Sequence, residues 1–315
     1  MQLLRLSLSS TSPLLTGCVA TLGKFDGLHQ GHKAVIQKLT AKAQALSLPS
    51  VVIVTEPQPD EYFQPGRSVR LTSLREKSLL LASLDVDYLA VLPFNAQLAG
   101  MSAETFIYDV LREQLQVRCF IAGDDSRFGY QRRGDADLLR QLADDTGIVV
   151  EETDSLLNDS IRISSTAIRE ALQQGDIGYA NSLFGHDYFI AGRVVHGDKR
   201  GRTLGFPTAN VHLRTTRPPL QGTFVTTVRL RDEMHQRPAI ANIGQRPTFN
   251  DAGIKLEVHL LNFNATLYGQ CLQVFFQQKL RDEKKFAALS DLRQQIDQDV
   301  QQAYDYFKLS PDRSY

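Results

Sequence analysis

The sequence predicts an open α/β sheet followed by a small antiparallel β domain with a C-terminal helix. Its 315 residues suffice for two hydrophobic cores, at about 150 residues per domain. Up to residue 185, short apolar runs alternate with segments of helical spacing, and from residue 186 strand-like runs follow one another without helices between them. We therefore expect two domains, one over residues 1–185 and one over residues 186–315.

In the first half, five apolar runs have the length of buried strands, at 19–22, 51–54, 88–92, 117–121 and 148–152. Between them apolar residues recur at helical spacing, within 33–46, 74–84, 103–115 and 135–144. Such alternation predicts parallel strands joined by right-handed crossovers. Ligands of these sheets bind at the carboxyl ends of the strands.

In the second half, the strand-like runs are 193–196, 223–230, 239–243, 255–262 and 271–278, separated by Gly, Pro and Asn. Many short strands without intervening helices predict a small antiparallel barrel or sandwich. Apolar residues on one helical face over 289–307 predict a helix that closes this domain.

The composition excludes several classes of protein. Hydrophobic residues make up 42% of the chain, which excludes disorder, and 35 Lys+Arg balance 35 Asp+Glu, which argues against a nucleic-acid partner. The apolar runs are far shorter than the ~20 residues of a membrane helix, and the N-terminus does not resemble a signal peptide. The distant Cys18, Cys119 and Cys271 predict buried, reduced thiols in a cytoplasmic protein.

The sequence GKFDGLHQGH at 23–32 follows the first predicted strand and opens a helix, with His29 and His32 one turn apart. Free N–H groups at the helix start and two imidazoles can bind phosphate. A structural histidine and a metal site are the alternatives, and Asp26 is the one further metal ligand nearby. Two of seven histidines in one glycine-rich turn favour an anion site.

The sequence ISSTAIR at 163–169 has the residue types of a second phosphate site. Ser165 and Thr166 are expected to cap a helix and to share its N–H groups with a phosphate, and Arg169 offers a planar guanidinium. Helix capping alone would explain the hydroxyls, but not the arginine.

The sequence GDKRGRTLGFPTAN at 197–210 places glycines and cations ahead of Thr208 and Asn210. Glycine N–H groups and cations suit phosphates, and the oxygens of Thr208 and Asn210 suit Mg²⁺. The segment is not a Walker loop, and on spacing alone an ordinary basic β-turn explains it equally well. In LEVH at 256–259, Glu257 has the chemistry of a general base, and the alternative is a solvent-facing glutamate on a half-exposed strand.

Together these motifs resemble a known family. HxGH and ISSTxxR are signatures of nucleotidyltransferases, and GDDSRFG at 123–129 and EPQP at 56–59 resemble flavin-handling segments. GFPTAN at 205–210, NIGQRPTF at 242–249 and LEVH resemble the riboflavin kinase signature. In this order, over 17–308, the chain resembles the bacterial bifunctional riboflavin kinase/FMN adenylyltransferases, or FAD synthetases.

This resemblance implies a Rossmann-like HxGH nucleotidyltransferase domain followed by a six-stranded antiparallel β-barrel riboflavin kinase domain with a C-terminal helix. The barrel domain would convert riboflavin and ATP to FMN and ADP. The first domain would convert FMN and ATP to FAD and pyrophosphate. It further implies Mg²⁺ with ATP as co-substrate, a cytoplasmic enzyme, and no membrane or nucleic-acid partner.

The resemblance assigns Glu257 as the base of the kinase reaction, and His29 and His32 to charge neutralisation during adenylyl transfer. The implied binding residues of the first domain are Gly23, Phe25, Asp26, Gly31, Asp125, Arg127, Ser164, Ser165, Thr166 and Arg169. Those of the second are Gly197, Lys199, Gly201, Arg202, Gly205, Pro207, Thr208, Asn210 and Arg281, with Thr208 and Asn210 also on the metal.

Two departures from the family and three alternatives accompany this assignment. Ser126 and Thr55 stand where the family usually has aromatic residues, which predicts weaker flavin binding in the first domain. One alternative is another nucleotidyltransferase, such as a pantetheine-phosphate type, which lacks the kinase signature. The others are a kinase with an impaired first site, and a flavin-binding regulator without turnover, which the retained catalytic residues disfavour.

Overall fold

The computed structural model describes residues 1–10, 12–123, 126–153, 157–158, 161–197, 205–213, 217–231, 233–245 and 254–310. The chain divides into two compact units. The first comprises Met1–Ser68 and Lys77–Ser164, and the second comprises Val69–Glu76 and Ser165–Tyr315.

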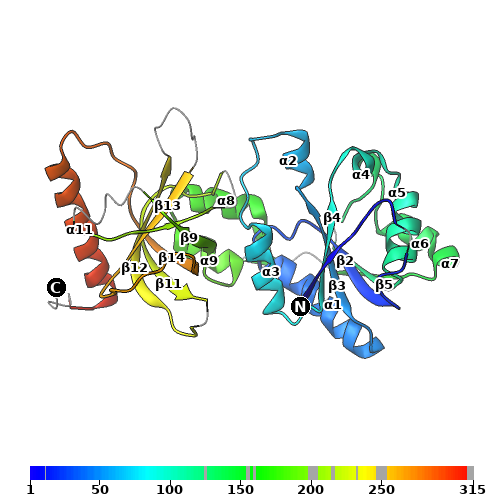
Figure 1. The fold of residues 1–315 in the computed structure, drawn as a ribbon. Coiled ribbons are helices and arrows are strands. Elements are labelled where there is room, and N and C mark those ends of the chain that lie inside the picture. The colour runs from blue at the N-terminus through cyan, green and yellow to red at the C-terminus, as the bar shows by residue number, and fades with distance from the viewer. Residues whose placement is uncertain are drawn as a thin grey trace. The chain divides into compact units, whose positions relative to one another are not determined.

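The first unit contains a six-stranded, entirely parallel sheet of order β1-β4-β3-β2-β5-β6 (Figure 1). Its strands are β1 (Gln2–Arg5), β2 (Cys18–Leu22), β3 (Ser50–Glu56), β4 (Tyr88–Pro93), β5 (Val117–Gly123) and β6 (Val149–Thr153). The five predicted strands and their parallel pairing are confirmed. The edge strand β1 was not predicted, because its two leucines between Gln2 and Arg5 are too short a run to give a strand pattern.

Helices connect these strands. They are α1 (Gln30–Leu46), α2 (Pro59–Phe63), α3 (Leu74–Ala82), α4 (Ala96–Gly100), α5 (Ala103–Thr105), α6 (Ala136–Gln141) and α7 (Ala143–Thr146), with a 3₁₀ turn η2 (Tyr130–Arg132). Helix α3 crosses the division of the chain, which falls between Glu76 and Lys77. A short hairpin of β7 (Leu157–Asn158) and β8 (Ile161–Arg162) follows β6.

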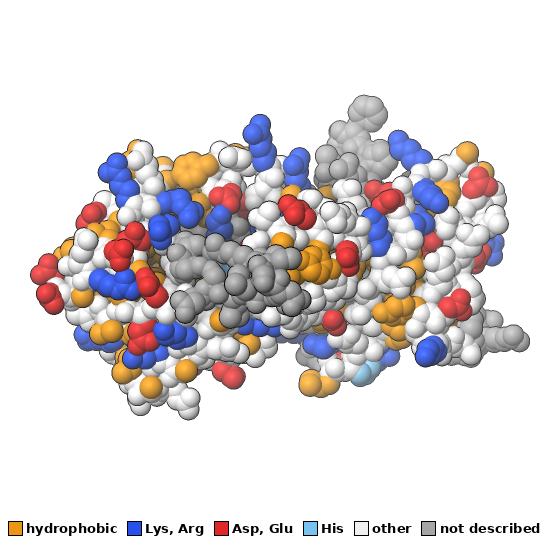
Figure 2. Space-filling view, turned by 180° about the vertical axis from the view of Figure 1, so that it is seen from behind, with side chains coloured by type: hydrophobic (Ala, Val, Ile, Leu, Met, Phe, Trp, Pro, Cys, Tyr) orange, Lys and Arg blue, Asp and Glu red, His pale blue; other side chains and the backbone are white. Residues whose placement is uncertain are grey.

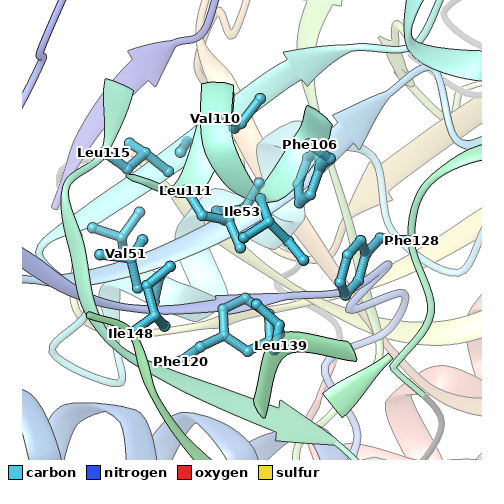
Figure 3. Packing of buried hydrophobic residues seen from close by; sticks show 14 of the residues in the cluster. Val51, Ile53, Phe106, Val110, Leu111, Leu115, Phe120, Phe128, Leu139 and Ile148 are labelled. Atoms are coloured by element: carbon cyan, nitrogen blue, oxygen red, sulfur yellow. The ribbon is translucent and has the colours of Figure 1, made fainter. Parts of the chain in front are cut away.

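The predicted helix over 103–115 is largely a π-helix, η1 (Phe106–Gln114). Its side chains Phe106, Val110 and Leu111 pack on one face of the sheet against Ile53 and Phe120 (Figure 3). Burial of these side chains stabilises the wider turn, whose backbone geometry is rare on its own. This core keeps the central strands rigid beneath the loops at their carboxyl ends.

The second unit contains a closed six-stranded barrel of order β10-β13-β12-β11-β14-β9, antiparallel throughout (Figure 1). Its strands are β9 (Phe189–Val195), β10 (Ala209–Val211), β11 (Gly222–Leu230), β12 (Arg237–Gln245), β13 (Ile254–Leu260) and β14 (Cys271–Arg281). Closure rules out the sandwich. The three-residue β10 was not predicted, because its length leaves no pattern to detect.

The described residues of the second unit also form the helices α8 (Ser165–Gln174), α9 (Ile177–Phe184) and α11 (Leu289–Phe307). Helix α11 has the predicted bounds and packs its Ala303 and Tyr304 against Val225, Ile240 and Leu261 on the outside of the barrel. Among the described helices, none has the length and apolar character that a bilayer crossing requires.

The three cysteines are free thiols. Cys18 and Cys119 are buried, and burial raises the pKa of Cys18 to about 12. The prediction that all three are buried is wrong for Cys271, which begins β14 and is half-exposed.

Candidate active sites

The loop that carries the two predicted histidines lies where the order of the parallel sheet reverses. From β2 the chain proceeds to β3 and β4 on one side and to β5 and β6 on the other. The loops after β2 and β5 therefore start side by side, and Ser126 Oγ donates to Leu22 O at 3.3 Å. Such a switch point is the usual ligand site of an open α/β sheet.

The loop between β2 and α1 has an unusual backbone. Phe25 and Leu28 adopt positive φ values of 44° and 43°, and both side chains are buried, as is that of Asp26. A Cβ on Gly23 would lie 3.0 Å from the ring of Phe25. Left-handed backbone at non-glycine residues is strained, and it persists where the surrounding structure enforces it, often at functional sites.

His29 and His32 form a stacked pair at the start of α1. Their ring centroids are 3.7 Å apart, and His29 is the N-cap residue, whose Nδ1 accepts from the backbone N–H of His32 at 3.4 Å. A Cβ on Gly31 would lie 3.2 Å from His29 Cε1, so the missing side chain leaves room for this imidazole. The structure thus brings together the predicted Gly23, Phe25, Asp26, His29, Gly31 and His32.

His32 is held in its neutral form. Burial, the adjacent His29 and the Lys77 ammonium keep the pKa of His32 well below its usual value. Its Nδ1 atom is buried and has no hydrogen-bond partner within the described residues. A neutral imidazole that carries its proton on Nε2 can donate one hydrogen bond to a phosphate oxygen.

The ISSTAIR motif surrounds the start of α8. Ser164 ends the first unit, and Ser165 begins both α8 and the longer segment of the second unit. Ser165 and Thr166 therefore lie in the first helical turn rather than in the capping position that was expected. Arg169 Nε donates to Val69 O at 2.7 Å, so one edge of this guanidinium already binds the backbone of its own unit.

Arg127 lies in the exposed loop after β5, where its guanidinium donates to Ser126 O at 2.8 Å. Asp125 lies outside the described residues, as do Lys199, Gly201 and Arg202 of the second motif. Residues 246–249 of the NIGQRPTF motif lie outside them as well.

In the barrel, the register places Glu257 of β13 between two asparagines. Asn210 of β10 and Asn242 of β12 are its direct neighbours on the two flanking strands. Leu256 and Val258 are fully buried while Glu257 is half-buried, so Glu257 faces outward from the barrel core. Cross-strand neighbours share a face, which forms a polar row of Asn210, Glu257 and Asn242.

The row continues to Thr223 of β11, whose hydroxyl donates to Asn242 Oδ1 at 3.2 Å. The Glu257 carboxylate makes no hydrogen bond or ion pair within the part of the chain that the structure describes. It is therefore available as a proton acceptor.

Asn210 has the features of a metal ligand. Its Oδ1 is buried without a hydrogen-bond partner among the described residues, and its amide lies directly over Gly197, where a Cβ would come within 2.2 Å of Nδ2. Thr208 lies two residues before Asn210, immediately ahead of β10, and supplies a hydroxyl. Hard oxygen ligands of this kind fit Mg²⁺.

His259 stabilises the turn that leads to Asn210 through a hydrogen bond to its backbone. Its Nδ1 pairs with Pro207 O at 2.9 Å, and its ring meets Phe206 edge-on. Burial lowers the pKa of His259, and the bond to Pro207 partly offsets this. Gly205 has a φ of 91°, which favours glycine at this turn. The predicted Gly197, Gly205, Pro207, Thr208, Asn210 and Glu257 thus surround one end of β10.

Arg281, which the sequence analysis predicts near a flavin or nucleotide, has a partner in its own unit. Its guanidinium makes a bidentate ion pair with the buried Asp299 of α11, with distances of 2.7 to 3.0 Å. No sequence pattern indicated this pair, because the two residues lie on different elements. The sequence analysis also missed Thr223, Asn242 and the buried Lys77, although Asn242 belongs to a motif that it quoted.

Family models match both halves of the chain. A model described as FAD synthetase matches residues 11–167, and one described as riboflavin kinase matches residues 184–307. The predicted domain boundary lies just inside the second match, and the segment between the two matches contains most of α8 and α9.

Curated relatives match nearly end to end. "Bifunctional riboflavin kinase/FMN adenylyltransferase" of Escherichia coli strain K12 is 43% identical over 295 residues, which cover 93% of this chain and 94% of the relative. The protein of that name from Haemophilus influenzae is 42% identical over 309 residues, or 98% and 99% of the two chains. A crystal structure described as a macrolide-efflux protein from Streptococcus pneumoniae has a TM-score of 0.77 at 28% identity, and covers 95% of this chain and 97% of that chain.

Proposed function

Since the chain belongs to the bifunctional riboflavin kinase/FMN adenylyltransferase family, it makes FMN from riboflavin and ATP and FAD from FMN and ATP, and we propose how its residues perform the two reactions. The observation that carries the proposal is the barrel register, which makes Glu257 the direct neighbour of Asn210. A proton acceptor thereby stands next to an unpaired amide oxygen.

In the kinase reaction, Glu257 accepts the proton of the ribityl hydroxyl as that oxygen attacks the γ-phosphate of ATP. The new O–P bond yields FMN, and the broken bond releases ADP. An alcohol is a poor nucleophile at neutral pH, so a positioned carboxylate lowers the barrier. The outward orientation of Glu257 and its freedom from other partners within the described residues support this role.

Asn210 Oδ1 and Thr208 Oγ1 would hold Mg²⁺ bound to ATP. The ion would neutralise phosphate charge during transfer. Gly197 supports this role because it leaves space for the Asn210 amide. For Lys199, Gly201, Arg202, Gly205 and Pro207 we keep the prediction of nucleotide binding. For Arg281 we keep that of proximity to the flavin or nucleotide.

In the adenylyl transfer, an FMN phosphate oxygen attacks the α-phosphate of ATP and pyrophosphate leaves. The nucleophile is already an anion, so catalysis depends on neutralising charge at the α-phosphate and the leaving group. His29, His32 and the amino end of α1 would supply hydrogen bonds there. The stacked imidazoles and the open space at Gly31 support this assignment.

Other residues of the first motif keep their predicted roles. Gly23, Phe25, Asp26 and Gly31 would shape the loop around the nucleotide, and Asp125 and Arg127 would contact the flavin or adenine. For the amino end of α8, with Ser164, Ser165, Thr166 and Arg169, we keep the prediction of phosphate binding.

We also retain the domain boundary at 185/186, a cytoplasmic location and the absence of nucleic-acid partners as proposals. Free thiols fit a reducing compartment. On the face seen in Figure 2, Lys and Arg side chains alternate with Asp and Glu and gather in no broad basic stripe, which supports small-molecule rather than nucleic-acid partners.

The test is incubation with riboflavin, ATP and Mg²⁺, followed by chromatographic separation of the flavins over time. FMN appears first and FAD later. We expect Glu257→Gln to lower FMN formation by ~10²-fold or more while FAD formation from added FMN is retained. For His32→Ala we expect the reverse: FAD formation from added FMN is lowered, while FMN formation from riboflavin is retained. Glu233→Gln, at a half-buried carboxylate paired with Arg237, and His235→Ala, at an exposed imidazole, serve as matched controls.

A Glu257→Gln chain that phosphorylates riboflavin at the parental rate would refute the base assignment. Parental FAD formation by His32→Ala would likewise refute the role of the imidazole pair.

A further inference from the structure

Lys77 of α3 is a fully buried lysine next to the proposed adenylyl-transfer site. Its exposed fraction is 1%, and its Nζ donates to the backbone oxygen of Lys24 at 2.5 Å. Lysine is almost never buried to this extent, because removing an ammonium from water is costly. Its position therefore calls for an explanation beyond packing.

The accepting carbonyl lies within the loop between β2 and α1. It immediately precedes Phe25, which has the positive φ described above. The Lys24 side chain points to the surface and pairs with Asp60. Lys77 thus binds the backbone of this strained loop from the interior, while the Lys24 side chain connects the loop to Asp60 at the surface. Together they fix the segment that leads into His29.

Lys77 also acts on the stacked imidazoles. Besides burial, the charged groups that lower the pKa of His32 are His29 beside it and Lys77 on α3. A fixed positive charge disfavours the imidazolium and favours anions in the same place. Triphosphate and pyrophosphate are such anions.

We propose that Lys77 is a positioning residue for adenylyl transfer, which holds the Lys24 carbonyl and with it the loop before His29, and places a positive charge near the imidazole pair. This proposal rests on the assignment of His29 and His32 to that reaction. No proton is transferred to or from Lys77, which acts through the loop and through its charge.

Two substitutions separate the hydrogen bond from the charge. Lys77→Met removes both and keeps the apolar stem, whereas Lys77→Gln keeps a donor and removes the charge. Lys42→Met is the matched control, since Lys42 lies on a helix of the same unit and pairs with Glu151. Rates of FAD formation from FMN and of FMN formation from riboflavin are measured on each chain.

We expect both Lys77 variants to lower kcat for FAD formation by about 10²-fold, with a smaller change in KM, because the charge acts mostly on the transition state. Riboflavin phosphorylation stays at the parental rate, which also shows that the second unit is folded, and an unchanged far-UV circular dichroism spectrum shows this for the first unit. Lys42→Met changes neither rate. Parental FAD formation by Lys77→Met would overturn the proposal.

A second measurement does not depend on activity, and its result for the parental chain does not depend on the folding of a Lys77 variant. With ¹³C-labelled histidine, the His32 resonance is assigned by its loss in His32→Ala, and its pKa is obtained by NMR titration. In the parental chain this pKa lies well below the usual value of a histidine, and in Lys77→Gln it rises. An ordinary His32 pKa in the parental chain would contradict the proposal.

The experiments distinguish a wrong assignment of His29 and His32 from a wrong role for Lys77. If His29 and His32 are not in the adenylyl-transfer site, His32→Ala retains FAD formation. If only the role of Lys77 is wrong, His32→Ala loses FAD formation and Lys77→Met keeps it.

Discussion

At the scale of single residues, two half-buried histidines connect stability to pH. Burial lowers the pKa of His32 and of His259 in the folded chain. In the unfolded chain both titrate near pH 6.5, so the unfolded state binds protons first as the pH falls. Their contribution to stability is therefore complete above that pH and is lost as the pH falls towards the folded-state values.

We predict that the melting temperature of the parental chain falls between pH 7.5 and pH 5.5, and that it falls less in His32→Gln. Each additional proton that the unfolded state binds lowers the free energy of unfolding by up to about 1.4 kcal/mol per pH unit. His235→Gln is the control, because its side chain is 62% exposed. Equal pH sensitivity of the His32 variant and the parental chain would contradict the prediction.

Sequence motifs indicated which residue types carry the chemistry, but not all of their neighbours. Glu257 and Asn210 were found because each lies in a recognisable motif, and their adjacency follows only from strand register. Lys77 gave no signal, because nothing local distinguishes a buried lysine from an exposed one. Arg281 was predicted near a ligand from its motif, but its pairing with Asp299 follows only from tertiary packing.

At the scale of elements, two helices offer a comparison of matched glycines. Gly31 is the second residue of α1 and Gly178 the second residue of α9. A Cβ on Gly31 would press on the His29 ring, whereas on Gly178 the nearest atom would be Asp176 Oδ1 at 3.8 Å. Replacing glycine by alanine within a helix stabilises the helix by a free energy of up to about 1 kcal/mol.

We predict that Gly31→Ala lowers FAD formation roughly tenfold, because a displaced imidazole is misaligned, without lowering the melting temperature. Gly178→Ala leaves both activities unchanged. Kinetics and thermal unfolding of the two variants provide the test, and an unchanged rate in Gly31→Ala would show that the imidazole tolerates the contact.

Helix α11 is attached to the barrel through one buried ion pair. Asp299 is 2% exposed and accepts from Arg281 and from Gln295. Removing one partner of a buried pair leaves an uncompensated charge and typically costs about 3–5 kcal/mol. We predict a loss of this size for Asp299→Ala, measured by urea unfolding of the full chain. Asp297→Ala, exposed on the same helix, should change little.

The elements that the sequence predicted are those with a repeating pattern of their own. Strand–helix alternation identified the parallel sheet, and one apolar face identified α11. The strands β1 and β10 are too short for a pattern and form through pairing with neighbours distant in sequence. The π-helix was predicted as an ordinary helix, because burial against the sheet determines its wider turn.

At the scale of the whole molecule, the two reactions depend on different motifs, and FMN is the product of one and the substrate of the other. We predict that FMN passes through solution. A mixture of Glu257→Gln chains and His32→Ala chains should then convert riboflavin to FAD after a lag, although neither variant does so alone. The amounts of FMN and FAD are followed by chromatography.

Two controls accompany this mixture. Each variant alone is assayed at the total protein concentration of the mixture, and the lag should shorten as the share of His32→Ala chains increases. Absence of FAD in the mixture would show that FMN is transferred within one chain.

The closed barrel has a consequence for association between molecules. Because β9 pairs with both β10 and β14, the barrel offers no open edge for a strand of another chain. The open sheet has two edges, but β1 has only four residues, and β6 carries Glu151 and Glu152 among basic partners. Amyloid-like growth must therefore begin with the detachment of a native strand, so heat or denaturant, rather than high concentration alone, would initiate it.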